Sequence, residues 1–150
     1  MIRLRLIALV VMAFLLPTIA SAELGGDVSS VQRDRAQMKA SLKIQQTSRY
    51  AIHEMTADSG TSVREYASPE GKVFAVTWQG QFNPDFQQLL GTYFSQLEKA
   101  TQQQRRARRA PVVLEQSGFV FQSYGHFRAL AGRAYVKDLV PQGVELGEIK

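Results

Sequence analysis

The sequence has no cysteine, two histidines, one tryptophan and five prolines among its 150 residues. Without cysteine the protein has no disulfide, no thiol nucleophile and no cysteine-based metal site. The two histidines, His53 and His126, are far apart in the sequence, whereas a zinc site usually needs three or four His, Cys or acidic ligands. The composition therefore predicts a protein that binds no metal and uses no cofactor.

The motifs of common catalytic and nucleotide-binding sites are also missing. The chain contains no G-x-S-x-G elbow, no S-x-x-K motif and neither of the glycine-rich phosphate loops. The acidic residues Glu54, Asp58, Glu65 and Glu70 lie in one hairpin region, but acids on turns and strand faces are mostly solvated. We therefore expect that the protein is not an enzyme. The alternative is a small periplasmic hydrolase or carbohydrate-active enzyme with a loop-assembled site.

Long apolar runs are absent except for one near the start of the chain. Arg3 and Arg5 precede the apolar stretch 6–16, and Ala20-Ser21-Ala22 follows it. This order is typical of a secretory signal peptide that is cleaved after Ala22. The alternative is an N-terminal membrane anchor, although the run is short for a bilayer span. No cysteine follows the run and no twin-arginine pair precedes it, so we expect export by the general secretory route.

This reading divides the chain into a signal peptide, residues 1–22, and a single α+β domain, residues 23–150, whose segment 23–49 is partly flexible. Cleavage removes two arginines and leaves 16 basic against 13 acidic side chains, a net charge of +3. We expect a periplasmic or extracellular protein with no transmembrane segment after cleavage. In that location nucleic acid is not an expected partner.

Residues 50–79 have the pattern of an antiparallel meander. Three short runs are separated by two turn signals, Asp58-Ser59-Gly60 and Ser68-Pro69-Glu70-Gly71. Pro69 suits the second position of a type I turn, and Gly71 is expected to have a positive φ. The third run, 72–79, is apolar on both faces and is predicted to be a central strand, with Phe74, Val76 and Trp78 on one face.

The strongest helix signal follows this meander. Asn83-Pro84-Asp85 supplies a cap, a proline for the first helical position and an acid for the first turn. One apolar stripe then recurs at helical spacing and comprises Phe86, Leu89, Leu90, Tyr93, Phe94 and Leu97. These features predict one long amphipathic helix over about 84–104. A thinner stripe over 27–42 predicts a short N-terminal helix, followed by a polar connector at 45–49.

The C-terminal part returns to strand patterns, at 112–115, 119–123, 126–131 and 134–136. Ser117-Gly118 and Tyr124-Gly125 are predicted turns, and Gly132 predicts a bulge or a close backbone approach. Residues 139–144 are predicted to close the chain as turns. The predicted fold is therefore α+β, with an antiparallel sheet of five or six strands (the meander 50–79 plus strands in 112–136) packed against the long helix.

A basic cluster follows the helical stripe and consists of Arg105, Arg106, Arg108 and Arg109. In an exported protein, anionic lipid head groups or an acidic polymer are its natural partners. The alternative is a solvated helix end, where cations complement the helix dipole.

Four separated pieces of the sequence match a known family in order: Leu24 to Gly26, Gly60 to Gly80, Pro84 to Phe94 and Tyr124 to Val144. On these pieces the chain resembles the secreted bacterial family called domain of unknown function 2844. The family pattern has Gly where Tyr124 stands, which argues against a role that needs a bare backbone there. The resemblance implies a secreted, envelope-associated protein and implies no activity.

These observations favour a secreted or periplasmic, non-enzymatic protein that binds an envelope component or a protein partner. A further possibility is an interaction subunit whose partner adds a strand to an exposed edge of the sheet.

Overall fold

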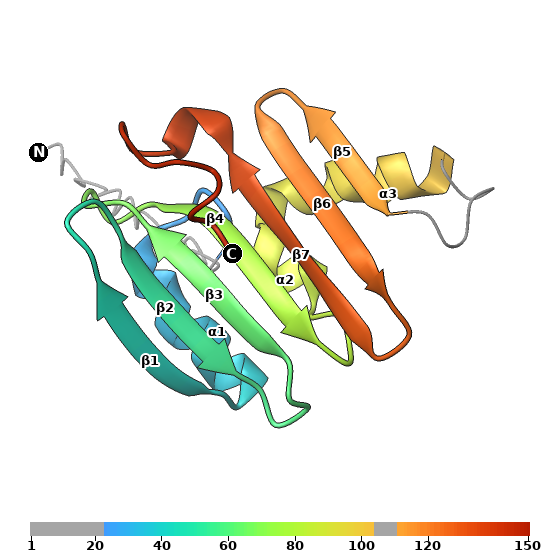
Figure 1. Cartoon of the computed structure of the whole chain (residues 1–150), viewed down its shortest axis with the longest axis horizontal. Coiled ribbons are helices and arrows are strands. Elements are labelled where there is room, and N and C mark those ends of the chain that lie inside the picture. Colours follow the sequence, from blue (N-terminus) through green and yellow to red (C-terminus); the bar gives the residue numbers. More distant parts are fainter. Residues whose placement is uncertain (1–22, 104–110) are drawn as a thin grey trace, which may run out of the picture.

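The computed structural model describes residues 23–103 and 111–150 (Figure 1). Seven strands form one antiparallel sheet: β1 (Ser41–Gln46), β2 (Ala51–Thr56), β3 (Ser62–Ala67), β4 (Val73–Gly80), β5 (Val112–Gln116), β6 (Phe119–His126) and β7 (Ala129–Val136). Their order is β1-β2-β3-β4-β7-β6-β5, so β4 is the central strand. The predicted α+β class is confirmed, but the prediction of five or six strands is wrong.

The additional strand is β1, which lies where the sequence predicted a helix end and a polar connector. A 3-10 turn η1 (Val28–Ser30) leads into α1 (Val31–Met38), and Lys39 then ends the helix with φ of 49°. From Ser41 the chain is extended and pairs with β2 in continuous register. Only Leu42 of β1 packs against the core. An edge strand with so few buried side chains lacks the alternation of apolar and polar residues by which a strand is predicted from sequence.

The predicted long helix is divided into α2 (Phe86–Leu90), the 3-10 turn η2 (Gly91–Tyr93) and α3 (Phe94–Gln103). Its N-cap is Asp85, whose side chain accepts hydrogen bonds from the amides of Gln87 at 2.9 Å and Gln88 at 3.1 Å. The break occurs at Gly91, where φ is 51° and a Cβ would overlap Glu23. The apolar stripe nevertheless packs on the sheet, because the turn η2 keeps its side chains on one side.

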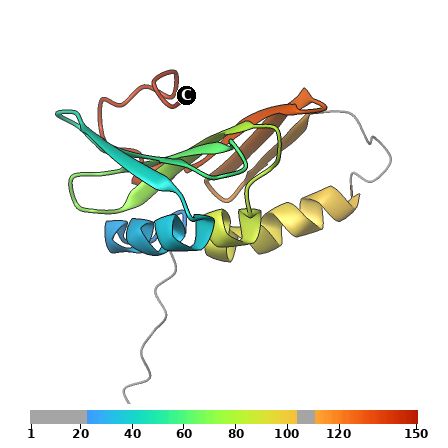
Figure 2. The same cartoon turned by 90° about the horizontal axis from the view of Figure 1, so that it is seen from below.

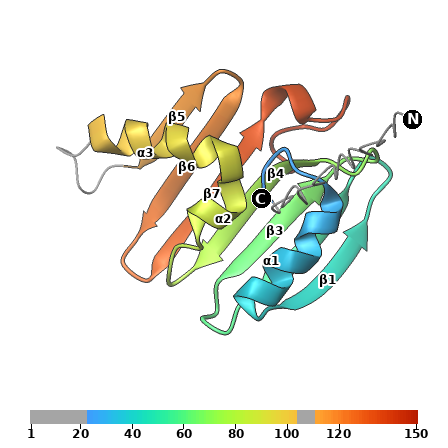
Figure 3. The same cartoon turned by 180° about the vertical axis from the view of Figure 1, so that it is seen from behind.

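The helices and the C-terminal residues lie on opposite sides of the sheet (Figures 2 and 3). We call the side covered by α1, α2 and α3 the helix face, and the other side the open face. On the helix face, Trp78, Phe86 and Phe121 form a compact aromatic group whose ring centroids are 4.9–5.3 Å apart. This group joins the larger of the two apolar clusters.

The second apolar cluster lies on the open face beneath the C-terminal segment, residues 140–150. The 3-10 turn η3 (Lys137–Leu139) leads from β7 into this segment, whose Ile149 is buried against Tyr50, Tyr66 and Phe74. The prediction that residues 139–144 close the chain as turns did not foresee that the residues after them dock on the sheet.

The prediction that Phe74 shares a face with Val76 and Trp78 is also wrong. Ala67 pairs with Val73 and Tyr66 pairs with Ala75, so Phe74 is an extra residue in β4. A bulge of this kind changes which face the following residues occupy. Phe74 and Ala75 therefore lie in the open-face cluster, whereas Val73, Val76 and Trp78 lie in the helix-face cluster.

The last hairpin differs from the prediction as well. Strand β6 continues through Tyr124 and Gly125, and the turn is formed by Phe127 and Arg128. Gly125 has φ of 120°, and a Cβ there would overlap the carbonyl oxygen of Ala129. Gly132 lies in unbroken register opposite Trp78, and a Cβ there would overlap the indole ring. Both glycines therefore permit close approach within paired strands.

Candidate functional site

The antiparallel register aligns polar side chains in rows across the open face. Residues directly opposite each other on antiparallel strands point to the same side of the sheet. One row crosses five strands and consists of Glu54, Arg64, Thr77, Arg133 and Gln122. The next row consists of Thr56, Ser62, Gln79, Ala131 and Tyr124. On the same open face, the C-terminal segment covers a neighbouring row of apolar side chains. The two polar rows therefore remain accessible.

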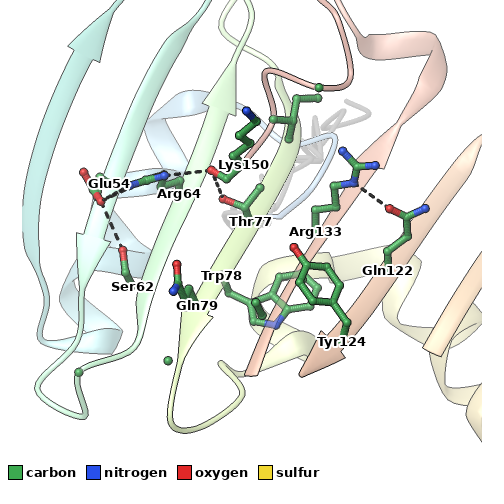
Figure 4. A pocket seen from close by; sticks show the side chains of 16 residues that line it. Glu54, Ser62, Arg64, Thr77, Trp78, Gln79, Gln122, Tyr124, Arg133 and Lys150 are labelled. Carbon is green, nitrogen blue, oxygen red and sulfur yellow. Dashed lines mark hydrogen bonds and ion pairs between the residues drawn. The ribbon is translucent and has the colours of Figure 1, made fainter. Parts of the chain in front are cut away.

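Except for Thr56, the residues of these rows line a cavity of about 820 Å3, which we call the groove (Figure 4). Its lining also includes Gly60, Ile149 and Lys150. Tyr124 stands at one side of the groove with 55% of its surface exposed. The groove is therefore a shallow site that combines an accessible aromatic ring with hydroxyl, amide and charged groups.

Arg64 holds one end of the groove in a fixed arrangement. Its Nε and Nη2 atoms donate to Glu54 Oε1 at 3.1 and 3.0 Å, and Nη1 donates to the main-chain oxygen of Lys150 at 3.0 Å. The same oxygen accepts hydrogen bonds from Tyr66 at 2.7 Å and Thr77 at 3.2 Å. Three donors from two adjacent strands therefore attach the C-terminal segment beside the groove.

Arg133 occupies the middle of the groove with fewer partners. Its Nε donates to Gln122 Oε1 at 2.8 Å, and Nη1 donates to the carbonyl oxygen of Leu146 at 2.8 Å. The guanidinium lies 5.8 Å from the ring centroid of Tyr135. Within the described residues Nη2 has no hydrogen-bond partner, so this atom can bind an acceptor that enters the groove.

The groove is positively charged. Arg64, Arg133 and Lys150 line it, and the only acidic side chain among its described lining residues is Glu54. Glu54 is paired with Arg64, and Arg133 has no acidic side chain within salt-bridge distance among the described residues. A concave surface with an excess of one charge attracts ligands of the opposite charge. The geometry therefore suits an elongated polar ligand that carries negative charge.

The two histidine side chains lie in different parts of the structure. His53 is buried on the helix face opposite Glu65, and burial lowers its pKa below the ordinary value. His126 is exposed at the end of β6. Within residues 23–103 and 111–150, no three His, Asp or Glu side chains are grouped so as to hold a metal ion.

A smaller cavity of about 280 Å3 lies on the helix face between α3 and strands β5 and β6. Its walls are mainly Phe86, Phe94, Leu97, Val112 and Phe121. Of the two cavities, the groove has more groups that can orient a polar ligand, and we take it as the candidate site.

No described helix is long and apolar enough to cross a membrane.

The residues predicted from the sequence lie mostly away from the groove. Gly60 borders it at the β2–β3 turn, whereas Pro69 and Gly71 form the turn between β3 and β4, where Gly71 has φ of 79°. The predicted signal peptide and the cluster Arg105, Arg106, Arg108 and Arg109 lie outside the described residues. Contact between these arginines and an anionic surface stays a prediction.

Sequence reasoning missed Arg64, Arg133, Gln122 and Tyr124 as site residues. Arg64 and Gln122 fell in predicted strands, whose alternation gives a face but no function, whereas Tyr124 was predicted in a turn and Arg133 lay between two predicted strands. The register that aligns them across β3, β4, β7 and β6 could not be read from the sequence, because β7 inserts between β4 and β6.

The fold and the groove define an α+β protein with a seven-stranded antiparallel sheet and a polar groove on the face away from the helices. A family model described as a protein of unknown function, DUF2844, matches residues 20–149, so the chain belongs to this family. The family resemblance expected from the sequence is thereby confirmed. No curated protein and no solved structure matches the chain significantly.

Proposed function

We propose that this protein is exported, is not an enzyme, and binds an acidic oligosaccharide of the cell envelope in the groove. The observation that carries the proposal is the combination of Arg133 and Tyr124 in one accessible, positively charged groove. Arg133 offers Nη2 to a carboxylate, and charge-assisted bonds between a guanidinium and a carboxylate are strong. Tyr124 offers an aromatic face on which a sugar ring can stack.

The other lining groups suit the hydroxyl groups of a sugar. Gln79 and Ser62 lie in the same row as Tyr124, and Gln122 lies beside Arg133. Amides and hydroxyls both donate and accept hydrogen bonds, as sugar hydroxyls do. Binding sites of this kind use a few placed polar groups to fix the orientation of the ligand.

The groove favours binding over hydrolysis. Glycoside hydrolysis usually needs two carboxyl groups on either side of the bond that is cleaved. Glu54 is the single acidic side chain among the described lining residues, and Arg64 contacts it through two nitrogen atoms. The hydrolase alternative therefore has less support than a binding role.

Isothermal titration calorimetry with a short oligomer of galacturonic acid tests the proposal, with the neutral galactose oligomer as the comparison. We expect the acidic oligomer to bind more tightly and its binding to weaken as salt is raised. Arg133→Gln and Tyr124→Ala should each weaken binding about tenfold, which corresponds to about 1.4 kcal/mol.

The controls are matched to these variants. Arg128→Gln removes an exposed arginine at the β6–β7 turn, and Phe82→Ala removes an aromatic ring that is 58% exposed, similar to Tyr124. Neither residue lines the groove, and both controls should bind like the unaltered protein.

Equal binding of acidic and neutral oligomers would contradict the proposal. Release of new reducing ends would support the hydrolase alternative, and preferential binding of polyglutamate would indicate an acidic peptide as the ligand.

A further inference from the structure

The two edges of the sheet differ in how well they are protected. Strands β1 and β5 are the edges, and each edge strand has backbone groups that its own sheet does not pair. Helix α3 extends past the outer side of β5, and Pro111, which has no N–H group, immediately precedes that strand (Figures 1 and 3). No described element lies beyond β1 (Figure 3). Within the described residues, β1 is therefore the open edge.

Strand β1 also lacks most features that prevent pairing with another strand. It has no proline and no bulge, and its only charged side chain is Lys43. Natural edge strands usually carry several charges, a proline or a bulge. On the helix face, Ile44 is 55% exposed opposite the buried His53. An apolar side chain beside an unpaired backbone edge favours the addition of a strand.

We infer that β1 pairs antiparallel with β1 of a second copy of this chain, about a twofold axis at Ile44. A twofold axis between two antiparallel strands places one residue directly opposite its own copy, because directly opposed residues must share a face. In a pairing centred on β1, that residue is either Lys43 or Ile44. An axis at Lys43 places two like charges opposite each other, which is destabilising. An axis at Ile44 places the two isoleucines together and sets each Lys43 opposite Gln45 of the other copy.

This pairing joins two seven-stranded sheets into one continuous sheet. The twofold axis is perpendicular to the sheet, so the helix faces of both copies lie on one side and both grooves open on the other. A long polymer could then contact both grooves, and linked sites bind more tightly than separate ones. The pairing itself rests on the β1 edge alone and does not depend on what the grooves bind.

Single-cysteine variants of the exported protein test the pairing, because the chain has no other cysteine. Directly opposed residues in an antiparallel pair have Cα atoms about 4.5–5.5 Å apart, within the range of a disulfide. Ile44→Cys should therefore form a cross-linked dimer under mild oxidation. Val113→Cys, at a residue of β5 that is 56% exposed, is the matched control and should form at most one tenth as much dimer. Equal cross-linking of the two variants would overturn the inference, and faster cross-linking of Lys43→Cys would contradict the register.

Sedimentation equilibrium provides the second test and needs no cross-link. The unaltered protein should show a concentration-dependent dimer, and Ile44→Asp should raise the dissociation constant at least tenfold while circular dichroism stays unchanged. Val113→Asp should leave the dissociation constant within twofold. A monomer at every concentration of the unaltered protein would overturn the inference.

Discussion

The two faces of the sheet bury apolar surface in different ways. On the helix face, three helices contribute side chains to one continuous cluster that includes Trp78, Phe86 and Phe121. On the open face, a single segment without regular structure covers a smaller cluster and is attached through Ile149 and the main-chain oxygen of Lys150. The comparison indicates that the helix face supplies most of the stability, while the open face leaves polar strand residues accessible.

Alanine substitutions of buried residues on the two faces should therefore have unequal effects, and this is the largest effect that we predict. Phe121→Ala removes ring contacts to Trp78 and Phe86 and should lower the free energy of unfolding by about 3–5 kcal/mol. Ile149→Ala should cost about 1 kcal/mol, because the C-terminal segment can detach locally without global unfolding. Urea denaturation measures both values. Equal losses would remove the proposed distinction between the faces.

Hydrogen exchange provides a local control for the same pair of variants. The amide of Lys150 donates to the Tyr66 hydroxyl at 3.1 Å and should lose protection in Ile149→Ala, while strand amides stay protected. In Phe121→Ala the strand amides should lose protection as well, because that substitution weakens the whole domain.

A substitution at a close contact on the helix face should have the next largest effect. Gly132→Val places a side chain where the indole of Trp78 lies and should destabilise the fold by about 3 kcal/mol. Gly147→Val is the matched control, because nothing lies within 4 Å of a Cβ at Gly147. Thermal denaturation should separate the two variants clearly. If Gly132→Val has the same melting temperature as the control, the close contact with Trp78 is not important for stability.

The β3–β4 turn joins two strands that contribute to both faces, and it should be moderately sensitive. Gly71 has φ of 79°, and its amide donates to the carbonyl oxygen of Ser68 at 2.9 Å. Gly71→Val should destabilise the fold by about 1–2 kcal/mol, because a β-branched residue is strained at positive φ. Gly71→Asn should lose less, since asparagine tolerates this conformation. Identical melting of the valine variant and the unaltered protein would exclude this turn type.

The smallest effect should be a pH dependence that arises on the helix face. Burial lowers the pKa of His53 below 6.5, so below that pH the unfolded chain binds more protons than the folded protein. Its contribution to stability should therefore be lost as the pH falls below 6.5 toward the lowered pKa, and should be constant above that range. His53→Gln should reduce the slope of unfolding free energy against pH, with Glu65 still present opposite it. His126→Gln, at an exposed position, is the control.

Much of the fold could be predicted from local patterns. The helical stripe that begins at Phe86 and the turns that contain Gly60, Gly71 and Gly118 rest on short-range preferences for helical spacing and positive φ. Strand β1 could not be predicted, because it buries almost nothing and owes its conformation to pairing with β2. The face of Phe74 was mispredicted because a bulge depends on the partner strand.

The groove could not be predicted for a related reason. Arg64, Thr77 and Arg133 are separated in the sequence and become neighbours only through the strand order β3-β4-β7. Alternation within one strand gives the face of each residue but not its neighbour across the sheet. The docking of Ile149 is likewise a long-range contact, made by a segment whose few apolar residues resemble an ordinary chain end.

The most direct test of the account is to map binding onto the two faces by NMR. Titration of 15N-labelled protein with the galacturonic acid oligomer should shift the backbone amide signals of Ser62, Gln79, Gln122, Tyr124 and Arg133, all in the groove lining. The amide signals of α1 and α3, on the helix face, should stay in place (Figure 2). Shifts that cluster on the helices, or no shifts at ligand concentrations that saturate a weak site, would contradict the assignment of binding to the open face.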